Sequence, residues 1–205
     1  MGRGSGAKRL SAGSYGGGTM QRTGIENGMI EASGVVQGQI DDIVDSIKPD
    51  SSGLISFGTI DKAGASLNKM MEVGDQLVIT YQNGGDQRIY EKTGKNSFRQ
   101  GQFTYNPTNI GNEIAAAKYP NPNLPVNKIT VTINRKLSQA QQNAADSIVS
   151  RVKRIKGTGL KFAINADRTI NFQYKNSQGS LVTGGINKNG VAKVMQVFGG
   201  TQGGF

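Results

Sequence analysis

The residues whose types and spacing suggest a chemistry lie in the segment LKFAINADRTINFQYK, residues 160–175. With the two-residue period of a β-strand, its apolar side chains fall on one face and its amides and amines on the other. The polar set is Lys161, Asn165, Asn171, Gln173 and Lys175. Such side chains donate hydrogen bonds to phosphates and read base edges, and none of the five carries a negative charge. The pattern favours a face that binds a polyanion, and the alternative is an ordinary solvated or protein-binding face.

Basic side chains are concentrated around this segment. Four of them lie in the run RVKRIK, residues 151–156. Cations in the last turn of a helix complement the helix dipole, but one or two would be enough for that purpose. The excess therefore predicts a surface that attracts nucleic acid. The basic residues of the region are Lys128, Arg135, Lys136, Arg151, Lys153, Arg154, Lys156 and Arg168, and the local acidic residues are Asp146 and Asp167.

The net charge of +10 is unevenly distributed along the 205 residues. Residues 125–205 hold twelve basic and two acidic side chains, whereas residues 26–50 hold one basic and six acidic side chains. The last part of the chain therefore carries an excess as large as that of the whole protein. This distribution predicts that a polyanion contacts the carboxyl-terminal part of the chain.

The composition excludes several kinds of catalytic and metal chemistry. The chain has no cysteine, so disulfides, zinc thiolate sites and cysteine nucleophiles are absent. It has no histidine either, which removes the commonest general base and the commonest metal ligand. GTGLK lacks the spacing of a Walker loop, and Asp41, Asp42 and Asp45 suit a solvated acidic helix better than a cation site. We predict a protein that is not an enzyme and that uses no metal and no cofactor.

Enzymatic function remains as a third hypothesis, because carboxylate or tyrosine chemistry needs neither cysteine nor histidine. It would require a concave site that collects Tyr90, Glu91 or Asp167. Their sequence spacing, like that of Glu113, does not indicate paired carboxylates.

Two regions of the chain show a regular pattern of helices and strands. In residues 53–118, a helix is followed by the hairpin LVITYQ-NGGD-QRIYEK, a third strand near 97–105 and a closing helix near 110–117. In residues 128–198, the strand KITVTINRK precedes a helix that begins with a capping box at Ser138 and Gln141. The hairpin of residues 160–175 and a short strand near 180–183 follow. A closing helix is predicted from four apolar residues at helical spacing: Val191, Val194, Met195 and Phe198.

These patterns predict an α+β protein with two small α-β-β-β-α units and antiparallel sheets. Whether the two units are a true duplication stays open. If KITVTINRK joins the second sheet, Thr130, Thr132 and Asn134 extend its polar face. Phe162, Phe172 and Tyr174 share a face with aliphatic residues. They therefore indicate a core beneath the helix and not an exposed stacking platform.

The remaining segments connect or flank these units. We predict a disordered, basic, glycine-rich tail over 1–28 and a short acidic helical segment over 29–52, with its helix near 37–47. Residues 119–127 contain three of the five prolines and predict a linker, and 199–205 form a second glycine-rich tail. No apolar run approaches the roughly 20 residues that a membrane helix needs, so we expect no membrane partner.

The start MGRGSG with GGG soon after, together with GDQLVITYQNGGDQRIYEKTGKNSF, resembles short uncharacterised accessory proteins of bacteriophages and prophages. The resemblance covers the tail and the first unit. It implies a phage-type origin and a location in the host cytoplasm or the virion. Proteins of this kind include virion components, DNA-binding factors and inhibitors of host defence.

The second unit resembles the double-stranded RNA-binding domain in its order α-β-β-β-α. In that family the closing helix begins with lysines that face phosphates, and Lys188 and Lys193 stand at the matching positions here. The lysines are sparse, and the first helix runs almost directly into its strand. The three-stranded sheets of integrase-type arm-binding domains, which read a DNA groove, are an equally close analogy.

We therefore predict a non-enzymatic, phage-type nucleic-acid-binding protein. DNA is expected in preference to RNA, and the strandedness and any homo-oligomer stay open. The alternative is a virion component or an inhibitor of host defence that binds a phage or host protein through the sheet face or residues 30–47. The predicted nucleic-acid-binding residues are Arg135, Lys136, Arg151, Lys153, Arg154, Lys156, Lys161, Arg168, Asn171, Gln173 and Lys175.

Overall fold

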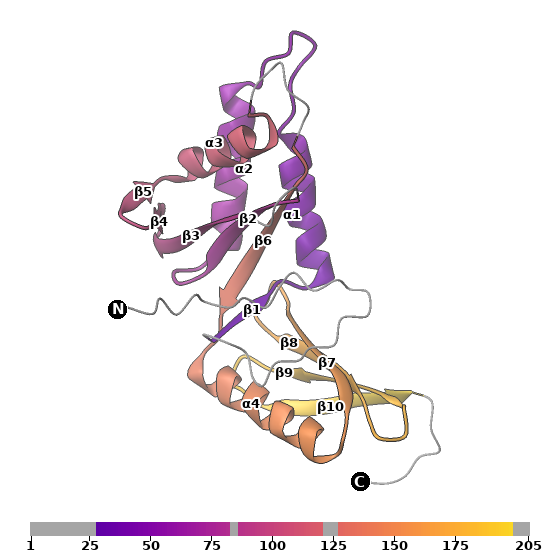
Figure 1. Ribbon diagram of the computed structural model, residues 1–205. Helices are drawn as coiled ribbons and strands as arrows, with labels where there is room; N and C mark the ends of the chain where they lie inside the picture. The colour runs from indigo at the N-terminus through magenta and orange to yellow at the C-terminus, as the bar shows by residue number, and fades with distance from the viewer. Residues whose placement is uncertain (1–27, 83–85, 121–126, 199–205) are drawn as a thin grey trace, which may run out of the picture. The chain divides into compact units, whose positions relative to one another are not determined.

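The computed structural model describes residues 28–82, 86–120 and 127–198 (Figure 1). The chain divides into two compact units. The central unit consists of residues 34–135, and the terminal unit consists of residues 1–33 and 136–205. Helices and antiparallel sheets occur in the chain as predicted, so the α+β class is confirmed. The predictions for residues 1–27, 121–126 and 199–205 lie outside the described residues, as does the turn at 83–85.

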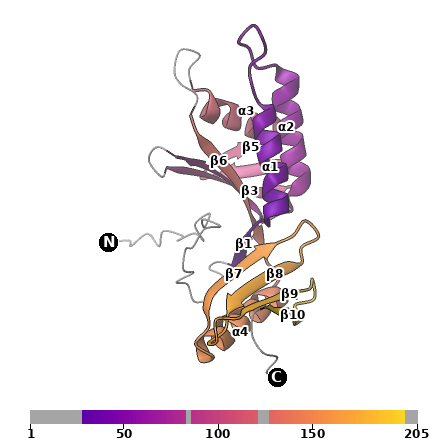
Figure 2. The same ribbon diagram turned by 90° about the vertical axis from the view of Figure 1, so that its right-hand side faces the viewer.

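The central unit contains three helices and most of a six-stranded sheet. Within this unit the strand order is β6-β2-β3-β4-β5. The helices α2 and α3 pack together and α1 lies beside α2 (Figures 1 and 2). The elements are α1 (Gly34–Ser46), α2 (Phe57–Met70), β2 (Gln76–Tyr81), β3 (Gln87–Gly94), β4 (Ser97–Gln100), β5 (Phe103–Tyr105), α3 (Pro107–Lys118) and β6 (Ile129–Lys136).

The predicted boundary between the units was wrong. We expected 128–198 to form the second unit, but β6 pairs with β2 from Gln76↔Asn134 to Tyr81↔Ile129. Val131 and Ile133 become buried there. An alternating strand fits either sheet equally well, so its local pattern does not specify its partner. The predicted segment 29–52 is also divided, because α1 belongs to the central unit and β1 (Met29–Glu31) to the terminal unit.

Two glycines permit the close packing of α2 and α3. A Cβ atom on Gly64 would overlap the carbonyl group of Pro107, and one on Gly111 would overlap the carbonyl oxygen of Ile60. Both obstacles are backbone atoms, which cannot rotate away as a side chain would. The two helix backbones therefore approach at a distance that only glycine allows.

Two lysines satisfy the carbonyl groups at helix ends. Lys92 Nζ donates to the carbonyl oxygens of Asn68 (2.7 Å) and Met71 (2.8 Å) at the end of α2. Lys118 Nζ donates to those of Val44 and Ile47, each at 3.0 Å, at the end of α1. Burial lowers the pKa of both lysines. Because the last carbonyls of a helix have no partner within it, these ammonium groups serve as caps.

Replacing Lys92 with methionine is expected to reduce the free energy of unfolding by about 2 kcal/mol. The side chain is only 6% exposed, so its two carbonyl acceptors would lose a charge-assisted donor without full access to water. Urea denaturation followed by circular dichroism measures the change. Lys62→Met, at an exposed position of α2, is the matched control and should change stability by less than about 0.5 kcal/mol. Equal effects of the two substitutions would contradict the capping role.

The terminal unit is a helix packed on one face of a four-stranded antiparallel sheet (Figures 1 and 2). Its elements are α4 (Gln139–Arg154), β7 (Thr158–Ile164), β8 (Ile170–Lys175), β9 (Leu181–Ile186) and β10 (Ala192–Phe198). The sheet order is β10-β9-β8-β7. The predicted capping box is present, since Ser138 Oγ accepts from the Gln141 N–H at 3.1 Å. Phe172 and Tyr174 are buried in the core, as predicted.

The predicted closing helix over 191–198 was wrong, because this segment forms the edge strand β10. Asn187 and Gly190 form a turn in which Gly190 has φ 78°, and the chain returns antiparallel to β9. The free backbone groups of β9 provide partners for a strand, and this outweighs helical spacing in so short a segment. The resemblance to the double-stranded RNA-binding domain is corrected for the same reason. The matching lysines should begin a closing helix, but Lys188 lies after β9 and Lys193 lies in β10.

Candidate nucleic-acid interface

The sheet of the terminal unit has one face that α4 does not cover, which we call the open face. Along β8, Ile170, Phe172 and Tyr174 are buried, whereas Asn171, Gln173 and Lys175 are exposed. Side chains on opposite faces alternate along a strand, so the exposed set defines the open face. The predicted division of the hairpin into an apolar and a polar face is confirmed.

Cross-strand pairing arranges the open face in three rows. One row consists of Ala163, Asn171, Gly185 and Lys193. The next consists of Lys161, Gln173, Thr183 and Gln196. The last contains Lys175, Leu181 and Phe198. Each row runs across neighbouring strands that lie about 4.8 Å apart, so its side chains can contact one ligand together.

The rows contain three lysines and no carboxylate. Between residues 136 and 198 the chain has ten basic side chains and two acidic ones, Asp146 and Asp167, a net charge of +8. Asp146 lies on α4 and Asp167 in the turn after β7. Hydrogen bonds from the Thr169 hydroxyl (2.6 Å) and the Thr169 N–H (3.0 Å) lower the pKa of Asp167. The central unit, in contrast, has ten basic and ten acidic residues, so the division of the fold is also a division of charge.

The open face brings together four of the predicted binding residues: Lys161, Asn171, Gln173 and Lys175. Asn165 directly follows β7, and its side-chain amide donates hydrogen bonds to Thr169 Oγ1 (3.0 Å) and Asn171 Oδ1 (3.2 Å). This contact orders the amides at that end of the face. The sequence had not indicated Thr183, Lys193, Gln196 and Phe198 as part of it. The turn residues Asn189 and Gly190 were the signal that could have placed the last three on a strand.

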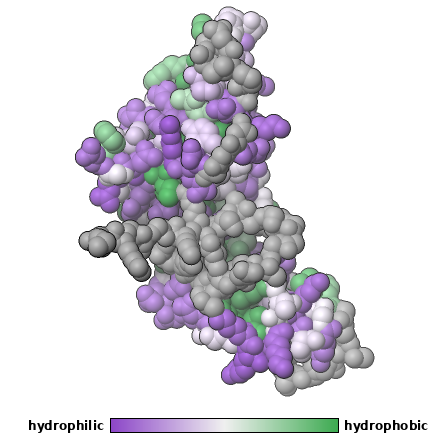
Figure 3. Space-filling view, viewed as in Figure 1, coloured by the Kyte–Doolittle hydropathy of each residue, from purple (hydrophilic) through white to green (hydrophobic). Residues whose placement is uncertain are grey.

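The predicted helix cations belong to a different surface. Arg151, Lys153 and Arg154 are exposed in the last turn of α4, and Lys156 follows it. Because α4 packs through Val149 and Val152 against the covered face of the sheet, its outward residues point away from the open face. Figure 3 shows hydrophilic side chains among those over α4. The predicted basic residues are therefore divided between two layers of the terminal unit.

Three further predicted residues lie elsewhere. Arg135 is only 3% exposed at the end of β6, so it is not a surface cation. Lys136, the next residue, is exposed. The Arg168 carbonyl accepts from Gln141 Nε2 at 2.7 Å, near the first turn of α4. Gln141 lies about 18 Å along α4 from Lys153. The Arg168 backbone is therefore far from the basic end of that helix.

Thr130, Thr132 and Asn134 do not extend the polar face, because the condition for it, that their strand joins the second sheet, is not met. They lie in β6 and pair with Thr80, Val78 and Gln76 of β2, in the other sheet. Thr132 is buried there. As with the unit boundary, alternation predicted the strand correctly but not its neighbour.

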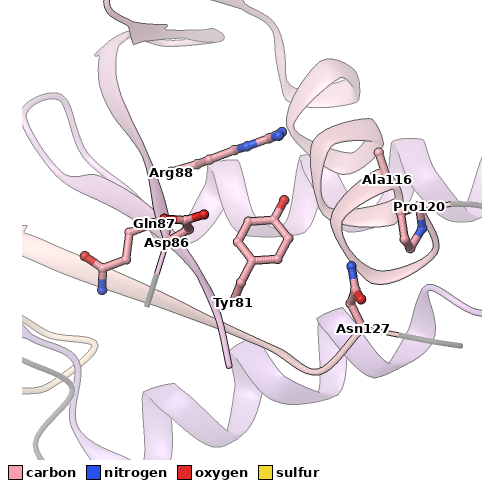
Figure 4. Close-up of a pocket in the computed structure, with 7 residues that line it drawn as sticks. All are labelled: Tyr81, Asp86, Gln87, Arg88, Ala116, Pro120 and Asn127. Carbon is pink, nitrogen blue, oxygen red and sulfur yellow. The ribbon is translucent and has the colours of Figure 1, made fainter. Parts of the chain in front are cut away.

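The central unit has a pocket of about 490 Å³ (Figure 4). Its lining residue Arg88 donates to Glu113 Oε2 (3.2 Å), which also accepts from the Tyr90 hydroxyl (2.6 Å). Burial, and then the bond to Glu113, raise the pKa of Tyr90. Glu91 follows Tyr90 on β3 and pairs with Arg99 on the opposite face at 3.8 Å. Tyr90 and Glu91 therefore lie on opposite faces of β3. The lining residues are Tyr81, Asp86, Gln87, Arg88, Ala116, Pro120 and Asn127.

The described residues show neither a cluster of metal ligands nor a helix that could span a membrane. Within residues 28–82, 86–120 and 127–198, no three carboxylates gather in a way that could hold a metal ion. Among the helices of this described part, none has the length and apolar character needed to cross a membrane.

Comparison of the chain with protein-family models, with curated proteins and with solved structures found no match.

Proposed function

We propose that the protein binds nucleic acid through the open face of its terminal unit. The observation that carries the proposal is the set of three rows in which Lys161, Lys175 and Lys193 stand among amides without a carboxylate. Lysines neutralise phosphates, and amides donate to and accept from bases and sugars. The surrounding charge of +8 between residues 136 and 198 would attract a polyanion from a distance.

The side chains have distinct roles in this proposal. Lys161, Lys175 and Lys193 contact phosphates, while Asn171 and Gln173 lie along the bases or sugars. The cations at the end of α4 contribute to the long-range field and not to the contact surface. No covalent chemistry is proposed, and DNA remains the expected ligand. The protein would act in the host cytoplasm or the virion, in line with the resemblance to phage accessory proteins.

Replacing Lys161, Lys175 and Lys193 together with glutamine is expected to weaken binding about 30-fold near 0.1 M salt. The loss of three phosphate contacts should also reduce the slope of log K against log salt by roughly 2 to 3. Fluorescence anisotropy with labelled single- and double-stranded DNA and RNA, at several salt concentrations, measures both quantities.

The matched control removes three charges from the other layer: Lys153→Gln, Arg154→Gln and Lys156→Gln. It should weaken binding only a few-fold, through the general field. If the control loses as much affinity and slope as the open-face variant, the ligand does not sit on the open face. If the unmodified protein binds none of the four nucleic acids at low salt, the proposed function is wrong.

A protein partner is the second candidate, and β10 is the observation that favours it. This edge strand has exposed apolar side chains, including Met195 and Phe198, and a partner can add a strand to such an edge. Within residues 30–47, which are the alternative surface for such a partner, Val35 is exposed, whereas Ile30, Val36, Ile40, Val44 and Ile47 are buried.

A further inference from the structure

Apolar side chains occupy one end of the open face, beside its lysines. Phe198 pairs with Leu181, and Leu181 pairs with Lys175. Val182, the next residue of β9, is buried against the helix side. Because neighbouring residues alternate between faces, Leu181 and Phe198 lie on the open face with Lys175.

Met195 is a second exposed apolar side chain of β10, and it lies toward the opposite end of the open face. It lies at the irregularity of β10 between Val194 and Gln196. Its Sδ is 3.7 Å from the position that a Cβ atom on Gly185 would take, on the open side of β9. Met195 is 74% exposed and Phe198 is 48% exposed. An aromatic ring and a thioether are thus presented to solvent at the edge of a basic, amide-rich face.

The structure assigns this face to single-stranded nucleic acid. This assignment rests on the proposed function and specifies the kind of nucleic acid that the open face binds. A duplex presents phosphates, sugars and groove edges, and its base faces are already stacked on one another, so a phenylalanine reaches them only at the cost of unstacking a base step. A single strand offers free base faces, which stack on aromatic side chains, and phosphates, which bind lysines.

One row of the open face contains both an aromatic ring on which a base can stack and a lysine that can bind a phosphate. Phe198 and Lys175 lie on strands two apart, with Cα atoms about 10 Å from one another. A base stacked on Phe198 leaves its phosphate on the side of Lys175, while Gln173 and Gln196 lie in the adjacent row. Stacking accepts any base, so the face is expected to bind with little sequence preference.

Phe198→Ala in the full chain is the direct test. Anisotropy titrations use labelled oligo-dT and oligo-U of about 16 nucleotides, and a DNA duplex of similar length. The substitution should weaken binding of the single strands by roughly tenfold and leave duplex binding unchanged. Phe198→Trp should restore single-strand binding, which excludes a general folding defect. Phe103→Ala, which removes another exposed phenylalanine, in the central unit (61%), should have no effect.

The outcomes separate this inference from the proposed function. Binding of single strands and duplex with equal affinity, unaffected by Phe198→Ala, would overturn the single-strand assignment and leave nucleic-acid binding in place. Absence of binding to every probe at low salt would overturn both. If Phe198→Ala instead abolishes self-association in sedimentation experiments without changing oligonucleotide affinity, β10 is a protein interface and the inference is wrong. Comparison of oligo-dT with oligo-U shows whether the DNA strand or the RNA strand binds more tightly.

Discussion

Gly64→Ala is expected to lower the free energy of unfolding by about 3 kcal/mol. The added methyl group would overlap the carbonyl group of Pro107 and lie 3.2 Å from the Gly111 nitrogen. Since all of these are backbone atoms, α2 and α3 would have to move apart. Within a helix, alanine is more favourable than glycine by about 1 kcal/mol. The overlap where α2 crosses α3 must therefore cost more than this gain for the prediction to hold.

Gly58→Ala is the matched control, because Gly58 lies in the same helix and a Cβ atom there has nothing within 4 Å. It should leave stability unchanged or raise it by about 0.5 kcal/mol. Urea denaturation of both variants, followed by far-ultraviolet circular dichroism, measures the difference. A Gly64→Ala protein as stable as Gly58→Ala would show that the helices can separate without loss.

Gly184→Ala is expected to have a comparable effect in the terminal unit, about 3 kcal/mol. Its methyl group would overlap the ring of Phe172 and the carbonyl oxygen of Lys193. The Phe172 ring is packed in the core between β8 and α4, and Lys193 belongs to the neighbouring strand. Relief of the overlap therefore requires a shift of β10 or a rearrangement of the core.

The adjacent Gly185 provides the control for this substitution. A Cβ atom there would meet the Ile170 carbonyl oxygen at 3.4 Å and Met195 Sδ at 3.7 Å, which are ordinary contacts. Gly185→Ala should change stability by less than about 1 kcal/mol. Hydrogen exchange measured by mass spectrometry should show faster exchange in β8, β9 and β10 for Gly184→Ala alone. Equal exchange in the two variants would contradict the tight packing at Gly184.

The local features of this chain could be predicted because they depend on residues close together in sequence. The capping box of Ser138 and Gln141 and the alternation of the 160–175 hairpin both involve contacts within a few residues. The net positive charge of the terminal unit could also be predicted, because it depends only on the composition of that part of the chain. The positions of Lys161, Asn171, Gln173 and Lys175 on one face followed from the two-residue period alone.

The closing segment shows where such reasoning stops. Val191, Val194, Met195 and Phe198 fit one face of a helix, yet the same residues form β10 because β9 offers an unpaired edge. This difference changes the candidate site, since it places Lys193, Gln196 and Phe198 on the open face. In a helix they would not form rows with β8 and β9.

The sequence by itself determined the types of most elements, their caps, and the basic, amide-rich character of the region that became the terminal unit. Only the tertiary structure decided that β6 joins β2, that Arg135 is buried, and that the cations of α4 and the lysines of the sheet occupy different layers. The physical reason is that periodicity reports which face of an element is apolar. Which partner covers that face depends on long-range packing, and it is this packing that selects the side chains available to a ligand.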